Sequence, residues 1–197
     1  MTETIQESEG DVDARLIERW RSGDERAATE LVERHAAALA RFAASLGERD
    51  EIEELVQDTF VRAFQALDGF RADSSLRTWL FTIARRLVLD RRRAGARRHA
   101  RLHFGEADVA IEHTALDAVV AEETEGRLQQ AVARLSPTQR EVFVLRVAEG
   151  RSYREIAEIA GTTEGAARVH YHYAMRSEGV SGCVTASTSR CARRSPT

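Results

Sequence analysis

Lysine and asparagine are absent from this sequence of 197 residues, and cysteine and proline occur only twice each. Both cysteines, Cys183 and Cys191, lie in the last fifteen residues, so a disulfide framework does not hold the rest of the chain together. No apolar run reaches the roughly 20 residues that a membrane-spanning helix requires. The acidic N-terminal stretch 1–13 also lacks the apolar segment of a secretory signal peptide. We therefore expect a cytoplasmic protein with no membrane insertion.

Arginine supplies all 29 basic residues, and its distribution along the chain is uneven. The stretch 85–103 carries eight arginines against one aspartate, whereas residues 104–126 carry seven acidic residues and no arginine. The formal net charge of −3 hides this segregation. A block of arginines predicts a surface that binds a polyanion such as nucleic acid, because the guanidinium group pairs well with phosphates and base edges. The alternative is an ordinary solvated helix end.

Strand patterns are nearly absent, and apolar residues instead recur at intervals of three and four, which is typical of helices. We therefore predict an all-α protein. The first helix is expected over 14–22, with Asp13 as its N-cap. The second is expected over 24–46, and Gly47 is a natural residue to end it.

The third predicted helix, over 51–67, has the clearest apolar stripe, and most of its charged residues lie away from that stripe. The stripe consists of Ile52, Leu55, Val56, Thr59, Phe60, Ala63, Phe64 and Leu67. A fourth helix is expected over 75–98, apolar at its start and basic at its end. Because the basic end coincides with the arginine block, this helix is the first candidate for contact with nucleic acid.

Three aromatic residues, Phe70, Trp79 and Phe81, lie just before the arginine block. Aromatic side chains beside a positive groove are what binding of single-stranded nucleic acid requires, because unpaired bases stack on them. Trp79 alternatively belongs to the core, since it shares an apolar stripe with Leu76 and Ile83. The sequence leaves both interpretations of Trp79 open.

The second half of the chain begins with a loss of helical period over 99–113, which predicts a flexible linker. A helix over 115–135 follows. Two capping boxes, SPTQ at 136–139 and SYRE at 152–155, then begin two further helices. The final residues, 178–197, are rich in serine, threonine and glycine and predict a disordered tail.

The segment SYREIAEIAGTTEGAARVHYHYAMR, residues 152–176, predicts a helix-turn-helix with its turn at Gly161. The side chains expected to pack inward are Ile156, Ala157 and Ile159 from the first helix and Ala166, Val169 and Tyr173 from the second. Those expected to face outward are Thr163, Glu164, Arg168, Tyr171 and His172. In a major groove arginine can bind a guanine edge and glutamate can accept from cytosine, while threonine contacts phosphate or a thymine methyl. The alternative is an ordinary helical hairpin with a solvated polar face.

Catalytic and metal-binding patterns are missing from the sequence. His170 and His172 are two residues apart, so on a helix they point in different directions and cannot share one ion. Adding Cys183 and Cys191 gives no recognised zinc spacing. No Ser/His/Asp order, glycine-rich phosphate loop or paired-carboxylate motif occurs. We therefore expect no enzyme activity, no metal and no cofactor.

Taken in order, four stretches resemble the group 4, or extracytoplasmic-function (ECF), sigma factors of bacterial RNA polymerase. They are DERAATELVERHAAALARFA at 24–43, EIEELVQDTFVRAFQAL at 51–67, FRADSSLRTWLFTIARRLVLDRRR at 70–93 and LSPTQREVFVLRVAEGRSYREIAEIAGTTEGAARVHYHYAMR at 135–176. The resemblance covers roughly residues 13–177. It implies a domain at 13–98 that binds the polymerase core and opens the −10 element of a promoter. It also implies a domain at 114–177 whose helix-turn-helix reads the −35 element.

The resemblance further implies functional residues and partners. The residues that would dock on the β′ clamp of the polymerase core are Glu54, Gln57, Asp58 and Arg62. Those that would capture and open the −10 element are Phe70, Arg71, Asp73, Ser74, Arg77, Trp79, Arg85, Arg86 and Asp90. Those that would read the −35 element are Thr163, Glu164, Gly165, Arg168, Tyr171 and His172. The β flap of the polymerase, promoter DNA and a cognate anti-sigma factor are the other implied partners.

The chain departs from the family pattern at two places. Arg86 stands where members of the family commonly have asparagine, which puts its detailed contact in doubt. The last helix passes into SEGVSGCVTAS where the family continues with a leucine-containing segment. Loss of that apolar turn would weaken the second domain, and a damaged sigma factor is one alternative.

Two other functions compete with promoter recognition by a polymerase subunit. A stand-alone helix-turn-helix regulator explains residues 135–176 but leaves the acidic-apolar helix and the Trp/Arg segment unexplained. A helical interaction protein with no role on DNA leaves the segregation of arginine to chance. Binding to core polymerase separates the first function from both alternatives.

Overall fold

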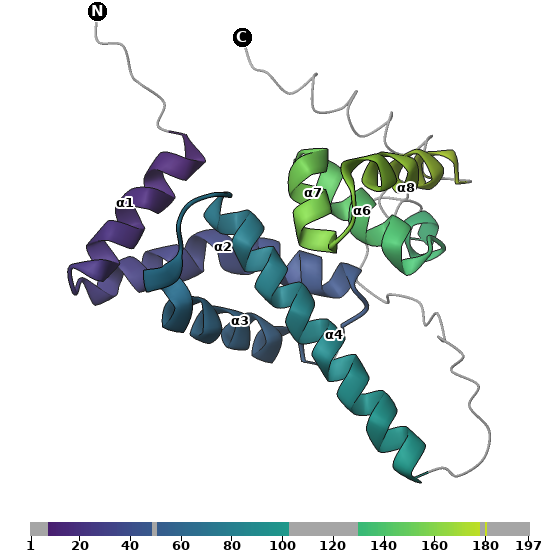
Figure 1. The fold of residues 1–197 in the computed structure, drawn as a ribbon, viewed down its shortest axis with the longest axis horizontal. Coiled ribbons are helices and arrows are strands. Elements are labelled where there is room, and N and C mark those ends of the chain that lie inside the picture. Colours follow the sequence, from purple (N-terminus) through teal and green to yellow (C-terminus); the bar gives the residue numbers. More distant parts are fainter. Residues whose placement is uncertain (1–7, 49–50, 103–129, 178–179, 181–197) are drawn as a thin grey trace, which may run out of the picture. The chain divides into compact units, whose positions relative to one another are not determined.

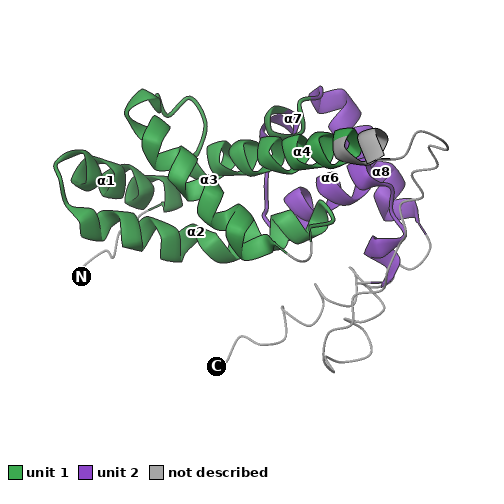
Figure 2. Ribbon diagram, turned by 90° about the horizontal axis from the view of Figure 1, so that it is seen from below, with its two compact units in different colours: residues 1–97, 158–161 green, residues 98–157, 162–197 purple. Residues whose placement is uncertain are grey.

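The computed structural model describes residues 8–48, 51–102, 130–177 and 180, and these residues are helical with short connections. The chain divides into two compact units, residues 1–97 with 158–161 and residues 98–157 with 162–197 (Figure 2). The described part of the chain contains no strand, so the prediction of an all-α fold with two helical bodies is confirmed. None of the described helices is long and apolar enough to cross a membrane.

The first unit is built from four α-helices and one short 3₁₀ turn (Figure 1). They are α1 (Glu9–Arg21), α2 (Glu25–Ser45), α3 (Ile52–Ala66), the 3₁₀ turn η1 (Leu67–Gly69) and α4 (Leu76–Leu102). Helix α1 packs on α2, and α2 packs on α3. Phe42 of α2 and Phe81 of α4 are fully buried, with ring centroids 4.9 Å apart. Burying two such rings makes this contact a main source of the unit's stability.

Both ends of α2 follow local rules of helix capping. Asp24 accepts a hydrogen bond of 3.0 Å from the backbone N–H of Arg26 and thereby caps α2. At the other end of α2, Gly47 has a φ of +92°, a left-handed conformation that glycine adopts without strain. The predicted end of this helix at Gly47 is therefore confirmed.

The predicted N-cap of the first helix is wrong. Helix α1 begins earlier, where Ser8 and Asp11 form a reciprocal capping box. Asp13 instead lies inside the helix, is 4% exposed, and contacts Arg34 and His35 of α2 at 3.1 Å each. Burial by itself raises the pKa of Asp13, but hydrogen bonds and charge from His35 and Arg34 outweigh it, so that the pKa lies below its ordinary value. Asp13 thus joins two helices rather than capping one.

Helix α4 is longer than its sequence pattern predicts. It runs to Leu102, so residues 99–102 are helical although they were expected to belong to the linker. Ala100, Arg101 and Leu102 are all good helix formers, which favours the extension. The rest of the predicted linker, 103–113, lies outside the described residues.

The C-terminal helices are α6 (Pro137–Val147), α7 (Tyr153–Ala160) and α8 (Glu164–Arg176), and α6 packs against α8 (Figure 1). Both predicted capping boxes are present: Ser136 with Gln139 begins α6, and Ser152 with Glu155 begins α7. Gly161 makes the turn with a φ of +63°. Of the helix predicted over 115–135, only residues 130–133 are described as helical, and its earlier part lies outside the described residues.

The expected tail contains one residue that belongs to the core. Val180 is fully buried and clusters with Leu135, Phe143 and Ala174. The prediction that ordered structure stops before residue 178 is therefore wrong at this position, because Val180 gains burial in the cluster although the residues around it are small and polar. The remainder of the predicted tail lies outside the described residues.

Candidate nucleic-acid interface

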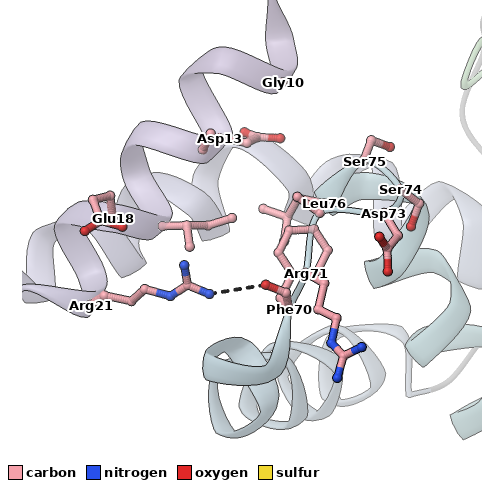
Figure 3. Close-up of a pocket in the computed structure, with 13 residues that line it drawn as sticks. Gly10, Asp13, Glu18, Arg21, Phe70, Arg71, Asp73, Ser74, Ser75 and Leu76 are labelled. Carbon is pink, nitrogen blue, oxygen red and sulfur yellow. Dashed lines mark hydrogen bonds between the residues drawn. The ribbon is translucent and has the colours of Figure 1, made fainter.

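A cavity of about 610 Å³ lies between α1 and the loop that connects η1 to α4 (Figure 3). The loop residues 70–76 line one side of it, and residues of α1 line the other. Four predicted −10 residues are therefore brought together here: Phe70, Arg71, Asp73 and Ser74. Arg71 and Asp73 are exposed, while Phe70 and Ser74 are half-buried. The cavity has the size of a small-ligand site and offers both charge signs and hydroxyl groups.

The aromatic residues near the arginine block have different roles. Phe70 packs against Trp79 with ring centroids 5.0 Å apart, and both are half-buried. Phe81 is 0% exposed inside the core, so the expectation that it lies beside the cationic surface is wrong. The reason is helical geometry, because Phe81 follows Leu80 and falls on the same buried face as Ala84.

The predicted −10 residues of α4 face different surroundings. Arg77 is only 19% exposed and forms an ion pair with Glu9 of α1. Arg85 is half-buried, whereas Arg86 and Asp90 are exposed. The side chains of Arg86 and Asp90 are therefore accessible to a partner, and Arg77 is already engaged within the unit.

The outer face of α3 forms an acidic cluster with α4. Arg91 binds the carboxylates of Glu51, Glu54 and Asp58 at 3.1, 3.1 and 2.9 Å. Burial lowers the pKa of Arg91, but the hydrogen bond to Asp58 and the surrounding carboxylates more than offset it and place the pKa above its ordinary value. One guanidinium cannot neutralise three carboxylates, so this face keeps a net negative charge.

The other residues of this face are open to a partner. Gln57 and Arg62 are exposed, as expected. Val61, which the sequence analysis did not single out, is 55% exposed between them. The exposure of Val61 could have been predicted from the sequence, because position 61 lies one turn after Gln57 on the polar side of the helix. An exposed valine beside these polar residues adds apolar area that a docking partner can bury.

The inward face of α8 differs from the prediction. Ala167 and Ala174 are fully buried, whereas Val169 and Tyr173 are 51% and 57% exposed. The prediction assigned the larger apolar residues to the core, but close packing of α8 against α6 needs small side chains at the contact. Val169 and Tyr173 therefore share the outward face with predicted −35 residues.

The predicted −35 residues lie at and after the N-terminus of α8. Thr163 caps the helix by accepting a hydrogen bond of 3.1 Å from the backbone N–H of Ala166. The exposed members of the predicted set are Thr163, Glu164, Gly165, Arg168 and His172. Tyr171 does not face outward as expected, since it is half-buried and packs on the core cluster of α6 and α8.

Tyr153 is a further residue of this surface that the sequence analysis used only as part of a capping box. The guanidinium groups of Arg146 and Arg168 lie 4.8 and 4.7 Å from its ring centroid. Its ring also meets Tyr171 edge-on at 6.0 Å. Tyr153 therefore holds Arg168, which also lies 3.5 Å from Glu164, in a defined position.

Among residues 8–48, 51–102, 130–177 and 180, no group of three His, Cys, Asp or Glu side chains is placed to hold a metal ion. The described residues thus define an all-α protein with an arginine-rich helix, α4, and a helix-turn-helix formed by α7 and α8.

Comparison with known proteins agrees with this class. Residues 31–98 match the family Sigma-70 region 2, and residues 125–177 match Sigma-70 region 4. The chain is 36% identical over 159 residues to the RNA polymerase sigma factor NccH of Alcaligenes xylosoxydans, covering 77% of this chain and 84% of NccH. It is 34% identical over 151 residues to the ECF RNA polymerase sigma factor SigL of Mycobacterium tuberculosis, covering 74% and 83%.

A solved structure is also similar. It is the sigma factor RpoE of Bartonella quintana in complex with the anti-sigma factor NepR, with a TM-score of 0.59, 29% identity and coverage of 80% of this chain and 96% of that one. The chain belongs to the sigma-70 family of RNA polymerase sigma factors, within the ECF group. Sigma factors are transcription initiation factors that act at promoters, not catalysts.

Proposed function

We propose that this chain directs RNA polymerase core to promoters by reading the −35 element with α8 and opening the −10 element with the loop 70–75 and α4. The observation that carries the proposal is the presence, in this order, of a region 2 match and a region 4 match in one chain. Two DNA contacts joined through one large enzyme gain from effective concentration, so neither unit needs to bind tightly alone.

Docking on the β′ clamp uses the outer face of α3 in this proposal. Glu54, Gln57, Asp58 and Arg62 lie on it, and Val61 adds an apolar centre. Its excess of carboxylates favours a basic partner surface. The β flap is the expected contact of the second unit.

At the −10 element, the cavity beside loop 70–75 receives an unstacked base of the non-template strand. Unstacking costs a few kcal/mol per base, which capture in a pocket and contacts from Arg71 and Arg86 would offset. At the −35 element, the exposed face of α8 enters the major groove, where Arg168 binds base edges and Val169 adds an apolar contact.

A solved structure of a similar sigma factor suggests how this chain is regulated. RpoE of B. quintana is held by the anti-sigma factor NepR, and we propose that a cognate anti-sigma factor binds this chain too. Its site of action is the cytoplasm, where the polymerase works.

The test is run-off transcription with sigma-free core polymerase on genomic promoter fragments. We expect transcripts with defined start sites that depend on the protein. Tight binding to duplex DNA without polymerase, together with no effect on transcription, would instead identify a stand-alone helix-turn-helix regulator.

Replacing Tyr153 by leucine is expected to reduce discrimination at the −35 element about fivefold. The physical reason is loss of the cation–π contact that positions Arg168, worth about 1 kcal/mol. Tyr153→Phe keeps the ring and should behave like the wild type. Transcription from promoters with altered −35 elements measures the effect.

A double-mutant cycle distinguishes this role from simple destabilisation. Arg168→Ala alone should cost about 1–3 kcal/mol of discrimination, and Tyr153→Leu should then add nothing further. Additive losses in the double variant would show that Tyr153 does not act through Arg168.

A further inference from the structure

The sequence pattern assigns no functional residue to helix α1, and the helix lies outside the region 2 match. It nevertheless forms one wall of the cavity beside the loop 70–75. Its residues on that wall run from Gly10 to Arg21, along almost the whole helix. Figure 3 shows α1 opposite the loop from Phe70 to Leu76, with the side chain of Arg21 reaching the carbonyl of Phe70. The cavity therefore exists only because α1 stands opposite the loop.

Helix α1 is attached to the loop region near both of its ends. Near its start, Glu9 pairs with Arg77 in the first turn of α4. At its end, one guanidinium nitrogen of Arg21 donates to the carbonyl oxygens of Leu67 and Phe70, at 3.1 and 3.3 Å. The two attachments bracket the loop, since Phe70 precedes it and Arg77 follows it.

The contact of Arg21 fixes the backbone where the loop begins. Leu67 and Phe70 are the first residue of η1 and the residue that follows it, so a single side chain ties both ends of this turn. Two residues later, Ala72 has a φ of +57°, which is unfavourable for a residue with a Cβ atom. Such a conformation persists only when the surrounding structure holds it, and Arg21 fixes the backbone of Phe70, two residues before this position.

The chemistry on the two sides of the cavity suits a nucleotide. The loop offers the cation of Arg71 for a phosphate, and Asp73 and Ser74 for the edge of a base. The α1 side contributes the exposed methyl group of Ala14 above the buried Ile17, and an aromatic ring can lie against this apolar patch. A site with only the loop would leave the second face of the base in water.

We propose that Arg21 is a positioning residue for base capture: from α1 it holds the loop 70–75 in the shape that keeps the cavity open for an unstacked base of the non-template strand. This inference rests on the proposed function. Arg21 need not contact the base, because its guanidinium is engaged with the backbone of the loop (Figure 3). The role of α1 is thus to complete a site that the loop alone does not form.

The experiment scans the −10 element with abasic sites. A promoter fragment that the wild-type protein transcribes with core polymerase is prepared with each non-template base of the element removed in turn. For the wild type, removal of the captured base should reduce transcription about tenfold or more, within the range that loss of base stacking costs. For Arg21→Ala, removal of the same base should change transcription less than about twofold, because capture is already lost.

The matched control is Arg26→Ala, which removes the same charge from an exposed arginine of the first unit that is not part of the cavity lining. Its abasic profile should match that of the wild type. For each variant, transcription from every abasic fragment is compared with transcription from the intact fragment. This comparison separates base capture from any general loss of affinity for DNA. If Arg21→Ala does not fold at the assay temperature, Arg21→Gln, which is shorter and uncharged, replaces it with the same expectation.

Two results would overturn the inference. One is an abasic profile of Arg21→Ala as steep as that of the wild type. The other is equal flattening by Arg26→Ala, which would assign the effect to charge. Failure of the proposed function looks different, since the wild type and the control would then direct no transcription from any fragment.

Discussion

Asp13→Ala is expected to lower the free energy of unfolding of the first unit by about 1–3 kcal/mol, because it leaves a buried ring nitrogen without its hydrogen-bond partner. The partner most affected is His35, whose side chain is 1% exposed and which would lose its contact with a carboxylate. Arg34, which is 34% exposed, can turn toward water instead. Denaturant unfolding at neutral pH measures the change, and Glu33→Ala, an exposed substitution on α2, should stay within about 0.5 kcal/mol.

The same residue predicts how stability depends on pH. The pKa of Asp13 is depressed in the folded state, so its contribution is fully present above the pKa of an unfolded aspartate, near 4. The contribution is lost as the pH falls from about 4 through the lower folded value. The difference in stability between wild type and Asp13→Ala should therefore shrink over that window. A constant difference down to pH 2 would mean that packing, not charge, is what the substitution removes.

The double variant Glu54→Lys with Asp58→Lys is expected to weaken binding to core polymerase about 100-fold or more. If the outer face of α3 docks on the polymerase as proposed, reversing two charges there replaces attraction to a basic surface by repulsion. Glu53→Lys is the matched control, because it makes the same type of change on α3 at an exposed residue beside the groove with α2. Competition with the wild type for core polymerase measures the effect.

This variant also removes two partners of Arg91, so its fold must be checked. Ion pairs at this degree of exposure contribute at most about 1 kcal/mol each, and thermal unfolding should show only a small loss. Equal loss of polymerase binding in Glu53→Lys would show that the overall charge of α3, rather than the face around Val61, governs docking.

Local rules allowed much of the fold to be predicted. The capping boxes at Ser136 and Ser152 and the turn at Gly161 depend on residues within four positions of each other, and all were correct. The first helix shows the limit of such rules. Ser8 and Asp13 are both good N-cap residues, and what decides between them is the pairing of Asp13 with α2, which no short stretch reveals.

The site was harder to predict for the same reason. Loop residues such as Phe70 and Ser74 could be grouped as a candidate site from the resemblance, but the opposite wall of their cavity belongs to α1, about fifty residues earlier. On α8 the error had another cause. Ranking side chains by hydrophobicity put Val169 inside, whereas the fully buried residues of α8 are Ala167 and Ala174.

The two alanines at 167 and 174 have a consequence for how new promoter preferences arise. They confine the packing requirement of α8 to one narrow side, where a larger residue would force the helices apart. Exposed positions on the opposite side can change with an effect on stability of about 0.5 kcal/mol or less. A lineage could therefore retune which genes this factor switches on through substitutions at Val169 or Tyr173, while the scaffold that presents them stays untouched.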